Sequence, residues 1–540
     1  MSSSNFLRGT LLLTGASFLS KFLGMIYVIP FTNMVGNTGM TLYGYAYIPY
    51  TILLSISTVG MPLAVSKFVA KYNTLNDYYT SMRMFKVGTV LMLITGFIAF
   101  LIMYFGAGLI AGWTMEADSK YISLDEVKHV IQMISFSLII IPSMAIMRGF
   151  FQGNQSMGPT AVSQVVEQII RIVFLLVAVF IVMMVLNGEK STAIGFATFS
   201  AFIGGLASWV ILGFYWKKRK KHLNATIDKQ KHKEKIPIAT LTKELFSYAG
   251  PFILVGIAIP MYQLIDQFTF NDAMSEIGKS DIADIAFSAF NVQGHKLVII
   301  PVTIATGLSL ALIPEITNAY NARDMIKLKQ QINQALQIIM FFVLPAVFGL
   351  VLLADPIYGS LFKIDNLEIT GKVFAWYAPV ALTFAFFTVT SSILQGIEKQ
   401  NFTLISLSAG ILTKVLLNSI FIQAFEEVGA IVVTMIATSI AVILNLWQIK
   451  KAINFQYRKF VKLSLLMLIF TSIMVIAILV VKAILAKFLD IYDNRFDAII
   501  MMLVGVGVGG SIYLYLGYTS TLFERITGRR IAVIDKLLRR

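Results

Sequence analysis

The stretch Leu12–Gly36 reads LLTGASFLSKFLGMIYVIPFTNMVG and indicates the class of protein. It can cross a bilayer as a helix, because the hydrocarbon core needs about 20 apolar residues per span. One cation, Lys21, lies near its middle. A lysine at that depth is costly unless it faces a partner or a water-filled cavity. The stretch therefore predicts a membrane bundle with a polar, cationic interior.

The composition extends this pattern to the whole chain. Of its 540 residues, 57% are hydrophobic and only 13% are charged, whereas a soluble domain averages roughly 25% charged residues. The chain has no cysteine, which excludes disulfides, thiolate metal sites and cysteine nucleophiles. No GxxxxGK[ST] loop is present, so ATP is not expected to drive the chain directly. We expect a membrane protein without a cofactor or a metal, and not an enzyme.

Apolar runs recur to the C-terminus and predict an all-α polytopic membrane protein with about fourteen transmembrane helices. The expected organisation is two pseudo-symmetric six-helix lobes plus two further C-terminal helices. The predicted domains are an N-lobe over 1–216, a basic cytoplasmic linker over 217–243, a C-lobe over 244–452, and the last two helices with a basic tail over 453–540. The predicted spans are 9–36, 42–71, 82–111, 127–150, 159–186, 192–216, 244–272, 285–320, 328–354, 370–397, 401–424, 428–450, 460–486 and 496–521.

The net charge of +16 is concentrated in alternate loops and in the tail. Basic loops mark the cytoplasmic side of a membrane protein, so both termini are predicted to be cytoplasmic. The most basic segment is the linker over 217–243. It is interpreted either as a solvated connector that fixes topology, which we favour, or as a patch for anionic lipid or nucleic acid. We expect membrane lipids, and not nucleic acid, as partners.

The two halves resemble each other in sequence. The motif Phe151-Gln152-Gly153 ends the fourth predicted span, and Leu394-Gln395-Gly396 ends the tenth. Counting on from those glycines, Ser163 matches Ser406 and Arg171 matches Lys414. The matched segments predict two repeats of parallel topology, and transporters place their substrates at such repeat interfaces.

Ionisable residues deep within spans are the candidates for a site, because intramembrane charge indicates function by default. Glu167 and Arg171 are four residues apart on one span and so share a helix face on which they can pair. The bases Lys21, Lys296 and Lys414 then exceed the remaining deep acid, Asp266. The full candidate set is Lys21, Arg171, Lys296, Lys414, Glu167, Asp266 and His295. A cavity with this excess of bases would attract a phosphate or pyrophosphate, and the alternative for each residue is a structural pair or a snorkelling side chain.

Two motifs resemble those of the MurJ-type lipid II flippases, a family of the polysaccharide-exporter (MOP) superfamily. Residues 20–24, SKFLG, are similar to the S-R-x-L-G signature of the first span. Residues 296–301, KLVIIP, with Gly307-Leu308 and Leu312-Ile313-Pro314, are similar to the R-L-x-x-x-P…G-x…L-P pattern of span 8. The count of fourteen spans and the division into six and eight also match, and the likeness is strongest to the Gram-positive branch.

The resemblance implies that Lys21 and Lys296 stand where the family has cavity arginines that engage a lipid's pyrophosphate. It also implies that the last two spans form a groove for a polyprenyl tail. The chain departs from the family at two positions: Ser55 replaces an arginine of span 2, and Ile299 replaces an acid of span 8. Arg171 and Lys414 are candidates for the missing positive charge.

The leading hypothesis is a flippase that moves lipid II, an undecaprenyl-pyrophosphate-linked sugar, from the inner to the outer leaflet of the bacterial plasma membrane. Alternating access driven by membrane potential or an ion gradient is the expected mechanism. Alternatives are an exporter of another undecaprenyl-linked glycan (teichoic acid, capsule or sporulation-related), a drug/cation antiporter and a membrane glycosyltransferase. An antiporter predicts a cavity rich in acids, and a glycosyltransferase needs a catalytic acid in an outer loop.

Overall fold

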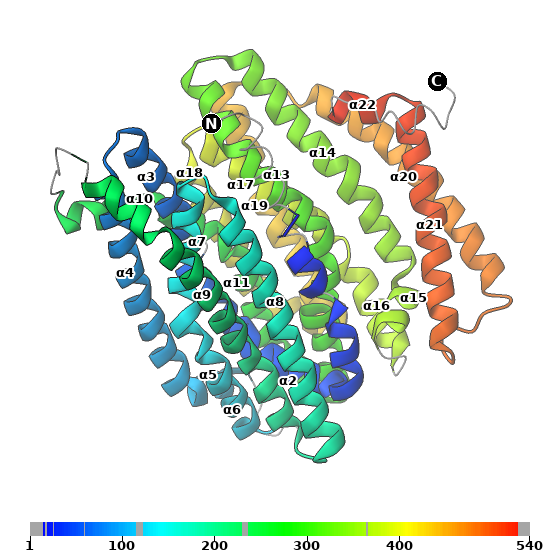
Figure 1. Ribbon diagram of the computed structural model, residues 1–540. Coiled ribbons are helices and arrows are strands. Elements are labelled where there is room, and N and C mark those ends of the chain that lie inside the picture. The colour runs from blue at the N-terminus through cyan, green and yellow to red at the C-terminus, as the bar shows by residue number, and fades with distance from the viewer. Residues whose placement is uncertain are drawn as a thin grey trace. The chain divides into compact units, whose positions relative to one another are not determined.

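The computed structural model describes residues 15–16, 19–24, 26–58, 60–114, 122–228, 230, 236–362 and 366–527 (Figure 1). The chain forms two compact units, Met1–Asp284 and Ile285–Arg540. Every regular element among the described residues is a helix, so the predicted all-α class is confirmed. The start of the first predicted span and the end of the basic tail lie outside the described residues. The lobe limits 1–216 and 244–452 stay a prediction.

The first unit is a bundle in which α8 and α9 run side by side and α7 packs against α3 and α4 (Figure 1). The helices α10 and α11 pack on α2 and therefore belong to the first unit, although they follow the predicted linker. The helices of this unit are α2 (Val28–Thr58), α3 (Met61–Thr74), α4 (Tyr78–Phe105), α5 (Ala107–Thr114), α6 (Leu124–Ser135), α7 (Ser137–Gly153), α8 (Met157–Phe180), α9 (Lys190–Asp228), α10 (Ile238–Gly256) and α11 (Ala258–Glu276), with a π-helical end Ile181–Val185 on α8; α12 (Ser280–Phe287) crosses the boundary.

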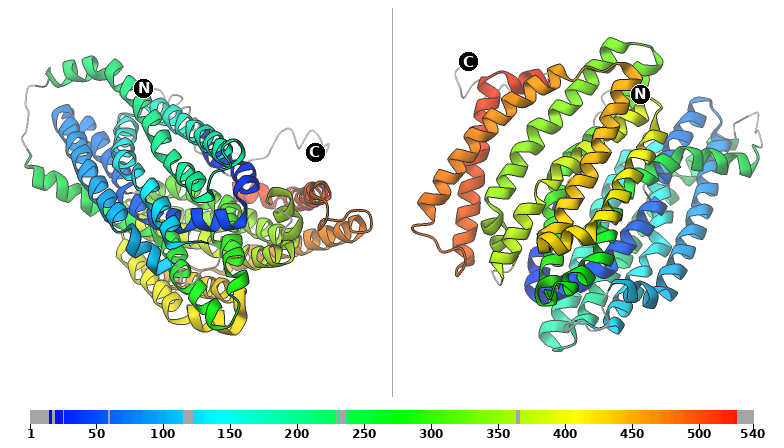
Figure 2. Two further views of the ribbon diagram at one scale, coloured as in Figure 1. Left: turned by 90° about the horizontal axis from the view of Figure 1, so that it is seen from below. Right: turned by 180° about the vertical axis from the view of Figure 1, so that it is seen from behind.

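The second unit begins with the last residues of α12 and a π-helical turn, and near its end α20 and α21 form a hairpin of two long helices (orange to red in Figure 2). In this unit α14 packs against α20, and α17 packs against α13 and α19. Its helices are the π-helix Ser288–Gly294, α13 (His295–Asn321), α14 (Met325–Leu352), α15 (Ala354–Leu361), α16 (Leu367–Tyr377), α17 (Val380–Gly396), α18 (Gln400–Phe425), the 3₁₀ turn Glu426–Val428, α19 (Gly429–Ile453), α20 (Arg458–Leu485), α21 (Arg495–Thr519) and α22 (Leu522–Thr527).

Eleven helical segments among the described residues are long and apolar enough to cross a membrane. One of them, Gln400–Ile453, contains two predicted spans, so these segments account for twelve of the fourteen. The other two correspond to α2–α3 and α10–α11, where the helix is interrupted near Gly60 and at Ile257. The prediction of a multi-pass membrane protein with about fourteen spans is confirmed.

The break between the first two predicted spans is a single glycine rather than a loop. Gly36 has φ 71° and lies inside the continuous run of α2, where it joins two helical pieces across a kink. A positive φ is strained for any residue with a Cβ, so glycine is required here. As a result α2 extends to Thr58, and the next break comes at Gly60.

The helix α9 continues through the first half of the predicted linker, up to Asp228. Lysine, arginine and leucine are good helix formers, so low hydropathy alone does not end the helix.

Asp77, in the turn before α4, accepts two hydrogen bonds. Gln230, beyond the end of α9, donates from Nε2 to Asp77 Oδ1 at 2.9 Å, and Asp77 also caps α4 by accepting from Thr80 N at 3.0 Å. Partial burial raises the pKa of Asp77, but the bonds from Thr80 and Gln230 outweigh burial and hold the pKa below its usual range.

Equivalent turns of the two units share the same backbone conformation and the same helix caps. The turn after α7 has a left-handed residue at Gln155, two positions beyond the helix end, and the turn after α17 has one at Glu398 in the same place. Aspartates cap α4 and α14 at equivalent turns, through Asp77 and Asp324. This local agreement follows the sequence repeat and supports pseudo-symmetric lobes.

Candidate functional site

The seven predicted site residues are divided between the two units. The first unit contains Lys21, Glu167, Arg171 and Asp266, and the second contains His295, Lys296 and Lys414.

Glu167 pairs with Arg148 of α7, and not with Arg171 on its own helix. Arg148 Nη2 lies 2.6 Å from Glu167 Oε2, and the two side chains are only 14% and 19% exposed. Arg148 also donates to Ser163 Oγ at 3.0 Å and to Ser208 Oγ at 2.8 Å. The pairing of Glu167 with Arg171 expected from their spacing is therefore wrong. A partner on an adjacent helix, held by two serines, satisfies the carboxylate instead.

Arg171 lies against a row of tyrosines on α2. Its guanidinium sits over the Tyr47 ring, 5.7 Å from the centroid, and its Nη2 donates to Tyr43 Oη at 3.5 Å. Tyr43 and Tyr47 are stacked with centroids 5.1 Å apart, and Tyr43 Oη is 3.4 Å from Tyr27 Oη. We name Arg171, Tyr27, Tyr43 and Tyr47 the tyrosine cage.

The cage holds the cation without neutralising it. Among the described residues no carboxylate lies within 4.0 Å of Arg171, and its buried Nε has no hydrogen-bond partner. Aromatic faces attract a guanidinium through their quadrupole, worth about 0.5–2 kcal/mol, but they carry no charge. The cage therefore keeps a full positive charge and an unused donor inside the bundle.

Lys21 lies on a short helical stretch beside α8. Ser20 Oγ donates to the carbonyl of Gln164 at 3.3 Å, and a Cβ at Gly24 would come 3.0 Å from the Gln168 amide nitrogen. The stretch therefore rises along α8 toward the cage, and Gln164 and Arg171 are about 10 Å apart along the axis at 1.5 Å per residue. The Lys21 side chain is exposed. No carboxylate among the described residues is within ion-pair distance of it.

Asp266 is buried on α11, next to a polar network that joins α11 to α2. Gln267 Nε2 donates to the Tyr45 carbonyl at 2.9 Å, and Tyr45 Oη donates to Asp284 Oδ1 at 3.0 Å. Asn271 Nδ2 also donates to Tyr45 Oη. This network fixes α2, the helix that carries Tyr43 and Tyr47 of the cage.

His295 and Lys296 form the first turn of α13, directly after the π-helical turn Ser288–Gly294. Both side chains are half-buried. His295 Nδ1 and Tyr377 Oη are 3.0 Å apart, and the imidazole also contacts the Phe384 ring. Single π-helical turns are frequent at functional sites because they rotate the side chains that follow.

Lys414 is fully buried between α18 and α19 of the second unit. Its Nζ donates to the Ala430 carbonyl at 2.7 Å and to Thr434 Oγ1 at 2.7 Å. Its counterpart by repeat, Arg171, is half-buried and faces tyrosines instead. The matched sequence positions thus have different surroundings.

The tyrosines of the cage are functional candidates that are absent from the set predicted from the sequence. Tyr43 and Tyr47 are four residues apart and so lie on one face of a helix, which is a detectable signal. Such a stripe is also typical of an ordinary core, so it gains meaning only beside Arg171. In the described ranges, no group of three or more His, Asp or Glu side chains lies close enough together to hold a metal ion.

Comparison with known proteins shows similarity over the whole chain. A family model for polysaccharide biosynthesis proteins matches residues 6–320, and a MatE model matches residues 251–420. Lipid II flippase MurJ of Bacillus subtilis is 43% identical over 532 residues, covering 98% of both chains. The uncharacterized membrane protein YabM of the same organism is 28% identical over 510 residues, covering 94% of this chain and 91% of YabM.

Solved structures share the fold. A lipid II flippase MurJ in an inward closed conformation superposes with a TM-score of 0.65 at 19% identity, covering 96% of this chain and 100% of that one. An inward-facing multidrug resistance MATE transporter of the MOP superfamily superposes with a TM-score of 0.62 at 14% identity, covering 82% and 98%. At these identities the likeness concerns the architecture.

Proposed function

Because this chain belongs to the MurJ-type lipid II flippases, within the polysaccharide biosynthesis protein family, we propose that it translocates lipid II from the inner to the outer leaflet. The observation that carries the proposal is 43% identity to a lipid II flippase over 98% of both chains. The chain is a transporter and not an enzyme. The substrate is an undecaprenyl-pyrophosphate-linked sugar, and no second function has a relative of comparable identity behind it.

The protein resides in the bacterial plasma membrane with both termini on the cytoplasmic side. The alternation of basic and acidic loops supports this orientation. Transport proceeds by alternating access, and membrane potential or an ion gradient resets the carrier. Moving one elementary charge across a potential of 100 mV changes the free energy by about 2.3 kcal/mol, which is enough to favour one conformation of the carrier at rest.

In the first unit, Arg171 and Lys21 are the groups that engage the pyrophosphate. The uncompensated charge of the tyrosine cage and the unused Nε of Arg171 support this role. A guanidinium presents a fork of donors that matches phosphate oxygens, and low dielectric strengthens the attraction. Lys21 adds a second positive charge on the stretch that packs against Gln164 and Gln168 of α8.

In the second unit, Lys296 is the residue that binds the anionic substrate, and His295 positions Lys296. The bond between His295 and Tyr377 supports the positioning role, since it anchors the first turn of α13. Glu167 acts through Arg148 as a structural residue of the N-lobe. For Asp266 and Lys414, a role in the cavity stays a prediction from the sequence.

Complementation tests the proposal. A strain depleted of its own lipid II flippase receives this chain, and lipid II accessible from outside is measured together with growth. We expect the unmodified chain to restore both, because a lipid II flippase supplies the missing step. If other lipid-linked glycans appear outside while lipid II does not, the function is export of another glycan.

The site assignment is tested in the same strain. We expect Arg171→Gln, Lys21→Ala and Lys296→Ala to abolish complementation at normal protein levels. Lys327→Ala removes an exposed lysine at the start of α14 and serves as the matched control, which should complement fully. Full activity of all three site variants would overturn the assignment without touching the proposed function.

A further inference from the structure

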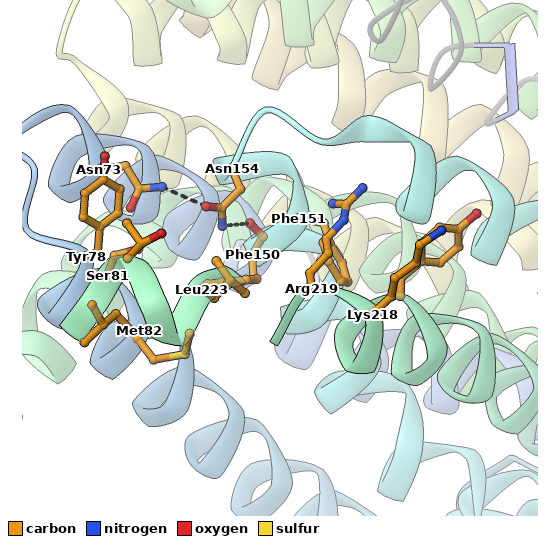
Figure 3. A pocket seen from close by; sticks show the side chains of 13 residues that line it. Asn73, Tyr78, Ser81, Met82, Phe150, Phe151, Asn154, Lys218, Arg219 and Leu223 are labelled. Atoms are coloured by element: carbon orange, nitrogen blue, oxygen red, sulfur yellow. Dashed lines mark hydrogen bonds between the residues drawn. The ribbon is translucent and has the colours of Figure 1, made fainter. Parts of the chain in front are cut away.

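The first unit contains a pocket of about 570 Å³ that the transport proposal does not use. It lies where α3 and α7 end and α4 and α8 begin, at one end of the bundle. Figure 3 shows Lys218 and Arg219 at one side of it and Asn73, Tyr78 and Ser81 at the other. The pocket is therefore at the border between the membrane-spanning helices and the solvent.

The extension of α9 beyond the apolar run forms the roof of this pocket. Arg219 Nη1 donates to Ser156 Oγ at 2.5 Å, in the turn between α7 and α8. Further along, Gln230 accepts from Tyr79 N at 2.9 Å and donates to Asp77, in the turn between α3 and α4. Because the roof is bound to both turns, the pocket is a built feature rather than a gap beneath a loose segment.

The charged residues of the lining are all cationic. The lining contains Lys218 and Arg219 and no acidic residue. In the part of the chain that the structure describes, no carboxylate lies within 4.0 Å of either cation. The Arg219 guanidinium lies over the Phe151 and Tyr215 rings, 5.4 and 6.0 Å from their centroids, which fixes its direction. Its other N–H groups stay available to an anion.

Another part of the lining is apolar and suits a hydrocarbon chain rather than a small ion. Met82, Phe150, Leu223 and Ile227 contribute to it, and Leu223 and Ile227 are four residues apart on the inner face of the roof. A free phosphate would fill only a small part of 570 Å³ and would leave these side chains in water. A ligand that combines one phosphate with hydrocarbon satisfies both parts of the lining.

We propose that this pocket binds the phosphate head group and proximal hydrocarbon of an anionic phospholipid. The phosphate lies at Lys218 and Arg219, and Asn73 and Ser81 face the glycerol region. The ligand enters from the adjacent leaflet, on the side where these helices end. The lipid thereby fastens the α9 extension to the bundle, independently of what the protein transports.

The test is lipid retention by the full-length protein, purified in mild detergent and examined by native mass spectrometry. Phosphatidylglycerol is titrated against phosphatidylcholine, and sn-glycerol 1-phosphate and inorganic phosphate form separate arms. Lys218→Ala/Arg219→Ala removes the site. Lys217→Ala/Lys221→Ala removes the same charge from the same helix outside the pocket lining, and Thr226→Phe fills the pocket without altering charge.

We expect one phosphatidylglycerol to bind selectively, and its affinity to fall by about tenfold or more in the Lys218/Arg219 variant, since a hydrogen bond to a charged group is worth about one such factor. The charge-matched control should change less than about twofold. Thr226→Phe should reduce binding while leaving Lys218 and Arg219 in place. Equal losses in both double variants would overturn the proposal in favour of diffuse attraction to a basic helix. Equal binding of the water-soluble phosphates, or no loss in Thr226→Phe, would also overturn it.

Discussion

Replacing Glu167 by glutamine should destabilise the protein because it leaves Arg148 charged inside the bundle. The two side chains form an ion pair of 2.6 Å and are 14% and 19% exposed. Glutamine keeps the shape and one acceptor oxygen but removes the negative charge. The variant therefore measures the electrostatic part of the pair.

The size of the effect follows from burial. Removing one partner of a buried pair costs about 3–5 kcal/mol, because a charge is left without compensation. Ser163 and Ser208 still accept from Arg148, so we expect about 2–3 kcal/mol for Glu167→Gln and a similar loss for Arg148→Gln. In the double variant no charge is left unpaired. Its loss should fall short of the sum of the single losses by about 2 kcal/mol.

The assay is the free energy of unfolding of the full-length protein in mixed micelles, followed by tryptophan fluorescence. A second cycle pairs Glu167→Gln with Arg171→Gln, the partner that helical spacing favours. We expect coupling below about 0.5 kcal/mol in this second cycle, because the cage and not Glu167 surrounds Arg171. Coupling of Glu167 to Arg171 with none to Arg148 would refute the reasoning from the geometry.

Three further outcomes are expected in the same unfolding assay. Gly149→Ala should cost about 1–3 kcal/mol, because its Cβ would lie 2.4 Å from the Pro62 carbonyl oxygen, whereas Gly158→Ala, with no neighbour within 4 Å, should cost nothing. Lys414→Ala should cost about 2–4 kcal/mol through a cavity and lost buried hydrogen bonds, seen as a loss of folded protein. The pKa of Asp77 is held below its usual range in the folded state. Its contribution is therefore present above the unfolded value of about 4 and is lost as pH falls through the folded value, so Asp77→Asn should flatten the acid side of the stability profile.

The fold class, the spans and the repeat are predictable from the sequence because they depend on composition and hydropathy. Helix limits are less predictable, since single residues determine them. Gly36 kinks α2 through its positive φ, where a loop is the natural expectation. The basic segment after Trp216 reads as a linker, yet Leu223 and Ile227 give it an inner apolar face and α9 continues through it.

The site is only partly predictable, because the ion-pair partner of a charged residue can come from a neighbouring helix. A spacing of four residues shows that Glu167 and Arg171 can meet, but it does not show that Arg148 comes closer from α7. The positions matched by the sequence repeat, Arg171 and Lys414, differ in their surroundings, because one lies against tyrosine rings and the other donates to a neighbouring helix. Spacing along a helix shows which charged residues can form a pair, and the packing of neighbouring helices determines which pairs form.

The choice of partners explains why Arg171 on α8 and Arg148 on α7 have opposite roles. Arg148 and Glu167 cancel each other, so together they exert little force on an anion beyond the pair. Arg171 is held by neutral rings, which repay part of its desolvation through cation–π attraction and leave its charge intact. An anion that approaches Arg171 supplies both the missing negative charge and the acceptor for Nε. The tyrosine cage is thus a way to keep a cation buried and available at once, which a carboxylate partner would prevent.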